Sequence, residues 1–300
     1  MLFDLLARAA GDAGSGSVLA AAALPFAFAG GGLLFAGDRP LTELGAPQLI
    51  AAGAALLLAA VLGLLGVVDR PALFVAGSAG GLLAVIGGWL ATMDTFGTAG
   101  AAAVVAGSAL AFSPLLAPLS IRAARMPIPV LPRGTADLLR DEPLPSRPAV
   151  YATVVRADGL LTGLVCGAVI AAVPSLLLLV RDGGTSVLVL TILLTVGFTL
   201  RARLHPVLAQ RVAWLLAAGS GVTVLTLGPL LAAGALTVAG PVLFGLSTLV
   251  MIIGLRRSTR ASSPRWGRYA ELLEVAIVLA VVPVVCAVLG LYGYLRGLGG

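Results

Sequence analysis

The sequence has 300 residues, of which 59% are hydrophobic and 11% are charged, and its formal net charge is +6. Soluble globular domains have roughly 45–50% apolar and about 25% charged residues, so this composition excludes a soluble protein. The apolar excess also excludes a disordered chain. We therefore predict a multi-pass membrane protein, and we assign its basic residues to cytoplasmic loops and not to nucleic-acid binding.

Apolar runs follow one another along the chain and predict about nine membrane helices. A helix that crosses a bilayer needs about 20 predominantly apolar residues. The runs are too long and too uniform for the alternating strands of an outer-membrane barrel. The fold class predicted is therefore all-α, a polytopic bundle. The predicted membrane helices are residues 18–36, 48–68, 72–92, 98–119, 159–180, 185–200, 212–231, 236–255 and 272–295.

The distribution of arginine predicts the orientation of this bundle. All 19 basic residues are arginine, and 16 of them fall on one side when the predicted helices alternate in direction. Loops rich in arginine and lysine stay in the cytoplasm. We therefore expect a cytoplasmic N-terminus, an external C-terminus and a multi-pass protein of the plasma (inner) membrane.

The only long loop, residues 120–158, lies on the predicted cytoplasmic side. Its prolines remove backbone donors and disfavour helix, although residues 150–156 are expected to begin the next helix early. The loop divides the chain into three parts. These are residues 1–119 with four membrane helices, residues 120–158, and residues 159–300 with five membrane helices.

Charged residues are costly inside a bilayer and usually mark functional sites there. None lies in the middle of a predicted membrane helix. Asp158, Glu271 and Glu274 stand near predicted helix starts, where the helix dipole favours an acid; a proton relay is the alternative. His205, the single histidine, has no neighbouring ligand. We predict no catalytic, cofactor-binding or metal-binding residue.

Glycines recur at four-residue spacing on two predicted helices. This spacing puts them on one helix face and lets another backbone approach closely. Two interpretations remain open, packing inside one bundle and an interface between subunits. The glycines are Gly159, Gly163 and Gly167 on one helix, and Gly77 and Gly81 on another.

Two basic cytoplasmic segments are candidate docking surfaces for a partner. The alternative for the second segment is an anchor in the inner leaflet, with arginine on anionic lipid and aromatic rings at the interface. The docking residues predicted in the long loop are Arg133, Asp137 and Arg140. Those predicted before the last helix are Arg256, Arg257, Arg265, Trp266 and Arg268.

Several segments resemble a known family when they are taken in order. They are PIPVLP at residues 127–132, VRAD at 155–158, RARL at 201–204 and SPRWGRYAELLE at 263–274. This series resembles EccD, the polytopic membrane component of type VII (ESX) secretion systems of actinobacteria. EccD proteins usually have a cytosolic ubiquitin-like domain and eleven membrane helices. By this resemblance, we expect this chain to lack that domain and the first two helices.

The resemblance implies a non-catalytic scaffold without cofactors. It implies as partners a second copy of the chain in a homodimer, other membrane subunits of the secretion complex including a separate ATPase, and membrane lipid. An alternative function is a secondary transporter or exporter of a small apolar solute, against which the lack of mid-membrane charge argues. A membrane enzyme acting on lipid is weaker still, because it needs a polar cluster.

Overall fold

A computed structural model describes residues 13–38, 40, 45–66, 71–126, 146–179, 183–232, 234, 237–238, 241–242, 245 and 264–292. Within these residues all regular elements are helices, so the prediction of an all-α fold is confirmed. The nine helices defined there are α2 (Ala13–Leu34), α3 (Ala46–Gly66), α4 (Pro71–Ala91), α5 (Gly97–Ala111), α6 (Ser113–Ala123), α8 (Arg147–Leu179), α9 (Thr185–Ala202), α10 (Leu208–Ala232) and α12 (Pro264–Val288).

Eight of the nine predicted apolar runs coincide with these helices, and the run at 236–255 lies mostly outside the described residues. Six helices are long and apolar enough to cross a membrane, namely α3, α4, α8, α9, α10 and α12. The pair α5 and α6 makes a seventh candidate if it is counted as one bent span. The apolar part of α2, Ala20–Leu34, is shorter.

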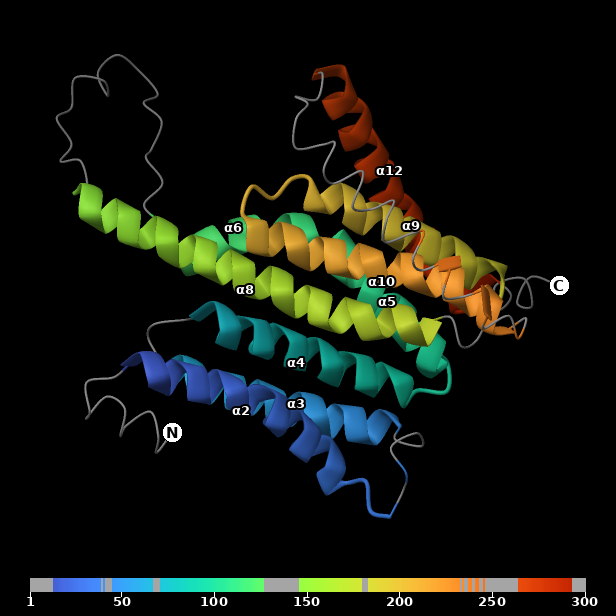
Figure 1. Cartoon of the computed structure of the whole chain (residues 1–300), viewed down its shortest axis with the longest axis horizontal. Helices are drawn as coiled ribbons and strands as arrows, with labels where there is room; N and C mark the ends of the chain where they lie inside the picture. Colours follow the sequence, from blue (N-terminus) through green and yellow to red (C-terminus); the bar gives the residue numbers. More distant parts are fainter. Residues whose placement is uncertain are drawn as a thin grey trace.

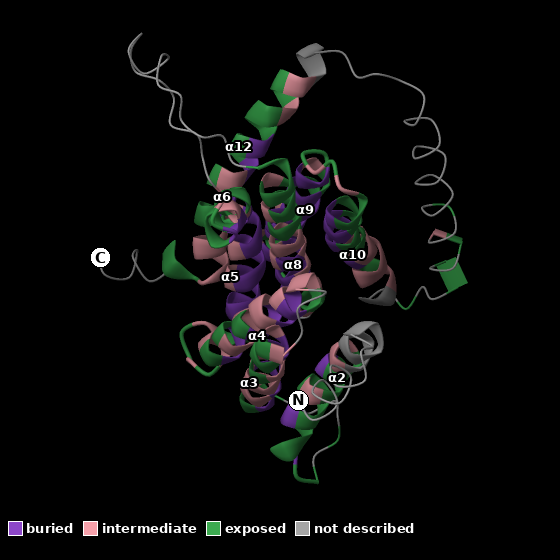
Figure 2. Cartoon of the chain, turned by 90° about the vertical axis from the view of Figure 1, so that its left-hand side faces the viewer, coloured by how far each residue is buried: buried purple, intermediate pink, exposed green. Residues whose placement is uncertain are grey.

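Helix α8 lies in the middle of the bundle (Figures 1 and 2). It packs against α4 on one side and against α5 and α10 on the other, while α3 and α2 continue the row beyond α4. Helix α12 is inclined steeply to the other helices, and its main contacts in the described part of the chain are with α9 and α5. Few of its described residues are therefore buried.

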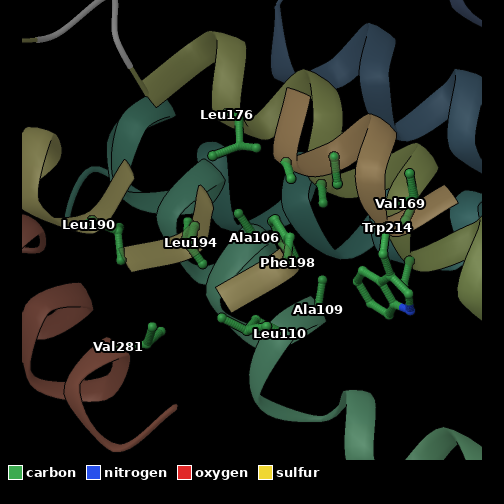
Figure 3. Close-up of a cluster of buried hydrophobic side chains, with 14 of the residues drawn as sticks. Ala106, Ala109, Leu110, Val169, Leu176, Leu190, Leu194, Phe198, Trp214 and Val281 are labelled. Carbon is green, nitrogen blue, oxygen red and sulfur yellow. The ribbon is translucent and has the colours of Figure 1, made fainter. Parts of the chain in front are cut away.

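The main core gathers where α5, α8, α9 and α10 meet (Figure 3). Phe198 and Trp214 are fully buried and stack with ring centroids 5.5 Å apart. Leu110, Leu194 and Leu176 are also fully buried in this cluster. Small side chains such as Ala106 and Ala109 fill the spaces between them, which lets the helices approach closely.

The predicted membrane helix at 98–119 is not straight, because α5 and α6 meet at an angle of 61° beside Phe112. Pro114 explains the bend. Proline has no backbone N–H, so the Leu110 carbonyl loses the hydrogen bond that it would accept in a continuous helix. The proline ring also clashes with that carbonyl. The Ser113 hydroxyl instead donates to the Leu110 carbonyl at 2.6 Å. The bend therefore leaves no lost hydrogen bond at this carbonyl.

Helix α8 begins at Arg147, which confirms that the helix starts well before its apolar run. Its 33 residues span about 50 Å at 1.5 Å per residue, against a hydrocarbon core of about 30 Å. The excess places the first turns of α8, which hold Tyr151 and Arg156, outside the hydrocarbon. Both side chains are exposed.

Candidate functional site

A buried ion pair joins α9 to α12 at one end of the bundle. The Nη1 atom of Arg201 lies 2.8 Å from Oε1 of Glu274, and the two residues are only 6% and 7% exposed. A buried charge without a partner costs several kcal/mol. The pair therefore fixes how far α12 can slide along α9.

Apolar contacts along the same two helices agree with this register. One helical turn before Arg201, Gly197 faces Ile277 of α12, and a Cβ on that glycine would lie 3.3 Å from the Ile277 Cγ2 atom. On α5, Gly107 faces Val281 and Val285 at 3.2 and 3.0 Å by the same measure. Helix α12 thus inserts apolar side chains opposite glycines, and the ion pair closes one end of the contact.

Arg201 is also linked to α10 through His205 and Trp214. The Nδ1 atom of His205 lies 3.1 Å from the Arg201 carbonyl oxygen, and the His205 ring lies 6.2 Å from the Trp214 ring. Two buried donors, the Nε atom of Arg201 and the Nε1 atom of Trp214, have no hydrogen-bond partner in the described part of the chain. The contacts of His205 are thus with the Arg201 backbone and the Trp214 ring, which suits it to a structural role.

A second polar contact joins α8 to α10. The side-chain amide of Gln210 donates to Oδ1 of Asp158 at 3.0 Å and to the Thr162 hydroxyl at 2.9 Å. Gln210 is 1% exposed, whereas Asp158 is exposed and Thr162 is half-buried, so the two bonds lie at the edge of the bundle. Hydrogen bonds of this kind contribute about 0.6 kcal/mol each between membrane helices.

The predicted helix-start role of the acids is wrong for Asp158, Glu271 and Glu274, all of which stand well inside their helices. Helices α8 and α12 begin at Arg147 and Pro264, and neither has an acid in its first turn. The helix dipole acts only within the first turn, so it does not reach these residues. Of the three, Asp158 and Glu274 have partners on neighbouring helices, where a glutamine and an arginine stabilise them instead.

The sequence held only a partial signal for the ion pair. Arg201 stands at the end of one predicted apolar run and Glu274 near the start of another, and the arginine distribution predicts both on one side of the membrane. The local sequence pattern does not show that α9 and α12 are in contact, because these helices are far apart in the chain.

Most predicted docking residues lie outside the described part of the structure. This holds for Arg133, Asp137 and Arg140 in the long loop and for Arg256 and Arg257. Arg265 and Trp266 fall in the first turn of α12, where only the backbone is described, whereas Arg268 is exposed on α12. The relation between the two predicted docking segments therefore lies outside the described residues.

Four of the five predicted packing glycines face neighbouring helices within the chain. A Cβ on Gly167 would lie 2.8 Å from the Ala76 carbonyl oxygen of α4, and one on Gly163 would lie 2.6 Å from the Ala72 carbonyl oxygen. A Cβ on Gly81 would lie 2.8 Å from the Gly53 carbonyl oxygen of α3, and one on Gly77 would lie 3.0 Å from the Ala60 Cβ.

A Cβ on the fifth glycine, Gly159, would lie 3.9 Å from its nearest neighbour, Pro71 Cγ. This is an ordinary van der Waals contact, so close approach does not require glycine there.

The chemistry available to these groups is limited. Among the described residues, no group of three or more His, Cys, Asp and Glu side chains is placed to hold a metal ion. Cys166 and Cys286 are free thiols on separate helices. The buried polar side chains described above contact one another across helices, which suits them to fixing helix positions.

The helices define a multi-pass helical membrane protein of the inner membrane. The chain belongs to the EccD family, because the profile of the EccD-like transmembrane domain matches residues 5–298. Proteins of this family are membrane components of type VII secretion systems. Comparison with curated protein sequences finds no significant match.

A solved structure, that of protomer 1 of the ESX-3 core complex, has a similar fold. Its TM-score is 0.70 at 22% sequence identity, and the match covers 97% of this chain. The chain spans 66% of the length of that structure's chain. At this identity the likeness establishes the fold.

Proposed function

We propose that this chain is a non-catalytic structural subunit of a type VII secretion complex and scaffolds the secretion machine in the inner membrane. The match of the EccD-like transmembrane domain over almost the whole chain carries this proposal. The use of buried polar groups for helix–helix contacts supports it, since Arg201, Glu274 and Gln210 all pair within the bundle.

The proposed partners are a second copy of the chain, other membrane subunits of the complex including a separate ATPase, and membrane lipid. The similar fold in a protomer of the ESX-3 core complex supports membership in a multi-subunit assembly. In this scheme the ATPase supplies the energy and the chain supplies fixed helical surfaces.

The docking surfaces proposed are the long loop with Arg133, Asp137 and Arg140, and the segment before and within the start of α12. The second contains Arg256, Arg257, Arg265, Trp266 and Arg268. Exposure of Arg268 is consistent with contact to a partner. The glycine faces, in contrast, are used largely within the chain.

Purification of the tagged chain from its native host in mild detergent tests the proposal. We expect a very large assembly that contains an ATPase subunit and other secretion components, identified by mass spectrometry. A chain that purifies as a monomer or small homo-oligomer, and transports a solute when reconstituted alone, would contradict it and favour the transporter.

Charge reversal at the docking segment gives a finer test. The double variant Arg265→Glu/Arg268→Glu is expected to reduce the recovered assembly while the chain still inserts into the membrane. Arg203→Glu/Arg211→Glu is the charge-matched control, since Arg203 and Arg211 are exposed in and after the connection between α9 and α10. Equal recovery from the double variant and the control would remove this segment as a docking surface.

A further inference from the structure

A groove of about 330 Å³ lies between α6, α9 and α12, at the end of the bundle where α9 stops. Its lining is almost wholly apolar apart from three charged side chains, and Pro114, Val275 and Val278 form part of its walls. The ion pair of Arg201 and Glu274 also lines it. Its size is at the lower end of the range found for ligand pockets.

The charges in this groove do not balance. Glu271 lies one turn before Glu274 and on the same face of α12, so the two carboxylates repel each other. The groove thus holds two carboxylates against the one guanidinium of Arg201. Glu271 is exposed and makes no ion pair among the described residues, not even with Arg268 one turn earlier.

Arg201 does not use all of its N–H donors among the described residues. Arg201 gives Nη1 to Glu274, whereas its Nε has no partner in the described structure. A guanidinium has five N–H donors in a planar fork, which suits it to bind a carboxylate and a phosphate at once. The Nε atom is itself buried, so the donors that face the groove are the other N–H groups of the Arg201 guanidinium. Among the described residues, the groove therefore offers an acceptor without an ion-pair partner at Glu271 and donors at Arg201.

The position of the groove matches the edge of a bilayer. Glu271 directly precedes the apolar stretch of α12, and Val275, Val278 and Leu279 continue the groove along that stretch. Charged side chains are favoured at the headgroup level and apolar ones in the hydrocarbon. One end of the groove is therefore suited to a headgroup and the other to an acyl chain.

We infer that this groove binds one aminophospholipid of the phosphatidylethanolamine class. Its primary ammonium donates to the Glu271 carboxylate, its phosphate accepts from the Arg201 guanidinium, and an acyl chain lies along Val275 and Val278. An anionic phospholipid leaves the Glu271 charge unbalanced. A choline headgroup has no N–H to donate to Glu271.

Native mass spectrometry of the full chain in mild detergent tests this site. The probes are phosphatidylethanolamine, phosphatidylcholine and phosphatidylglycerol with identical acyl chains. We expect one phosphatidylethanolamine to be retained roughly tenfold better than the other two, the effect of one hydrogen bond to a charged group. The net charge of +6 by itself favours phosphatidylglycerol, so bulk electrostatics does not produce this order.

A variant pair assigns the effect to the groove. Glu271→Gln is expected to abolish the preference for phosphatidylethanolamine without lowering the unfolding temperature, because Glu271 is exposed. Asp94→Asn is the matched control, since Asp94 is an exposed acid in the turn between α4 and α5. It is expected to keep the preference.

Three results would overturn the inference. They are equal or stronger retention of phosphatidylglycerol, a preference that survives Glu271→Gln, and binding of soluble phosphoethanolamine as tight as that of the lipid. The last result would assign the groove to a soluble headgroup.

Discussion

Arg201 and Glu274 come from helices far apart in the sequence and meet with both side chains buried. Such a pair matters more than a surface pair, because water and salt screen buried charges much less than exposed ones. Each residue is stable in its place only while the other is present. The pair therefore makes the position of α12 depend on α9.

Breaking the pair tests this dependence. We expect Glu274→Gln to lower the stability of the chain by about 3–5 kcal/mol, because it leaves the Arg201 charge buried without a counterion. The double variant Arg201→Met/Glu274→Met removes both charges, and we expect it to recover most of that loss. The measurement is the midpoint of thermal unfolding in detergent. A double variant as unstable as the single one would show that packing, and not charge, is what the pair supplies.

At the scale of the helices, close packing depends on where a glycine faces another backbone. Gly163 and Gly167 bring α8 against α4, and Gly53 and Gly81 bring α3 against α4. Helices without a hydrophobic driving force between them gain from such contacts through van der Waals packing. The row from α2 to α8 in Figure 1 follows from these small residues.

Two glycines of α8 give a matched pair for this point. We expect Gly167→Ala to destabilise the chain by about 1–3 kcal/mol, because the new methyl group meets the α4 backbone. Gly159→Ala has room, and we expect it to be neutral or to stabilise by up to about 1 kcal/mol through helix propensity. Thermal unfolding measures both variants, and we expect the unfolding temperature to fall for Gly167→Ala and not for Gly159→Ala. Equal changes would contradict the packing described.

The helices themselves could be predicted because hydropathy is a local property. Eight apolar runs coincide with helices, and the early start of α8 also followed from local sequence. The bend at Phe112 was missed, although Pro114 was visible, because proline inside a membrane helix often leaves it continuous. Pro174 and Pro283 do so in α8 and α12.

Most of the candidate site could not be predicted from the sequence, because its contacts are long-range and not local. The four-residue glycine spacing defined a face of α8 but not its neighbour, and nothing local indicated that Glu274 would meet Arg201. These contacts depend on which helices pack together. The acids were therefore assigned to helix starts that lie, in the structure, two or more turns earlier.

At the scale of the whole molecule, the orientation of the bundle remains a prediction from its arginines. Asp94, between α4 and α5, is predicted outside, and Arg203, after α9, is predicted in the cytoplasm. In a background with Cys166→Ala and Cys286→Ala, we expect a membrane-impermeant maleimide to label Asp94→Cys in spheroplasts and to label Arg203→Cys only after lysis. The reverse pattern would invert the topology.

The proposed role of the chain is to hold a secretion complex together. Its most direct test is the native size of the ATPase subunit in membranes from a strain that lacks this chain. We predict that the ATPase leaves its large assembly and that secretion stops, and that the intact chain restores both. An ATPase that stays in an assembly of unchanged size, with normal secretion, would contradict the scaffold role.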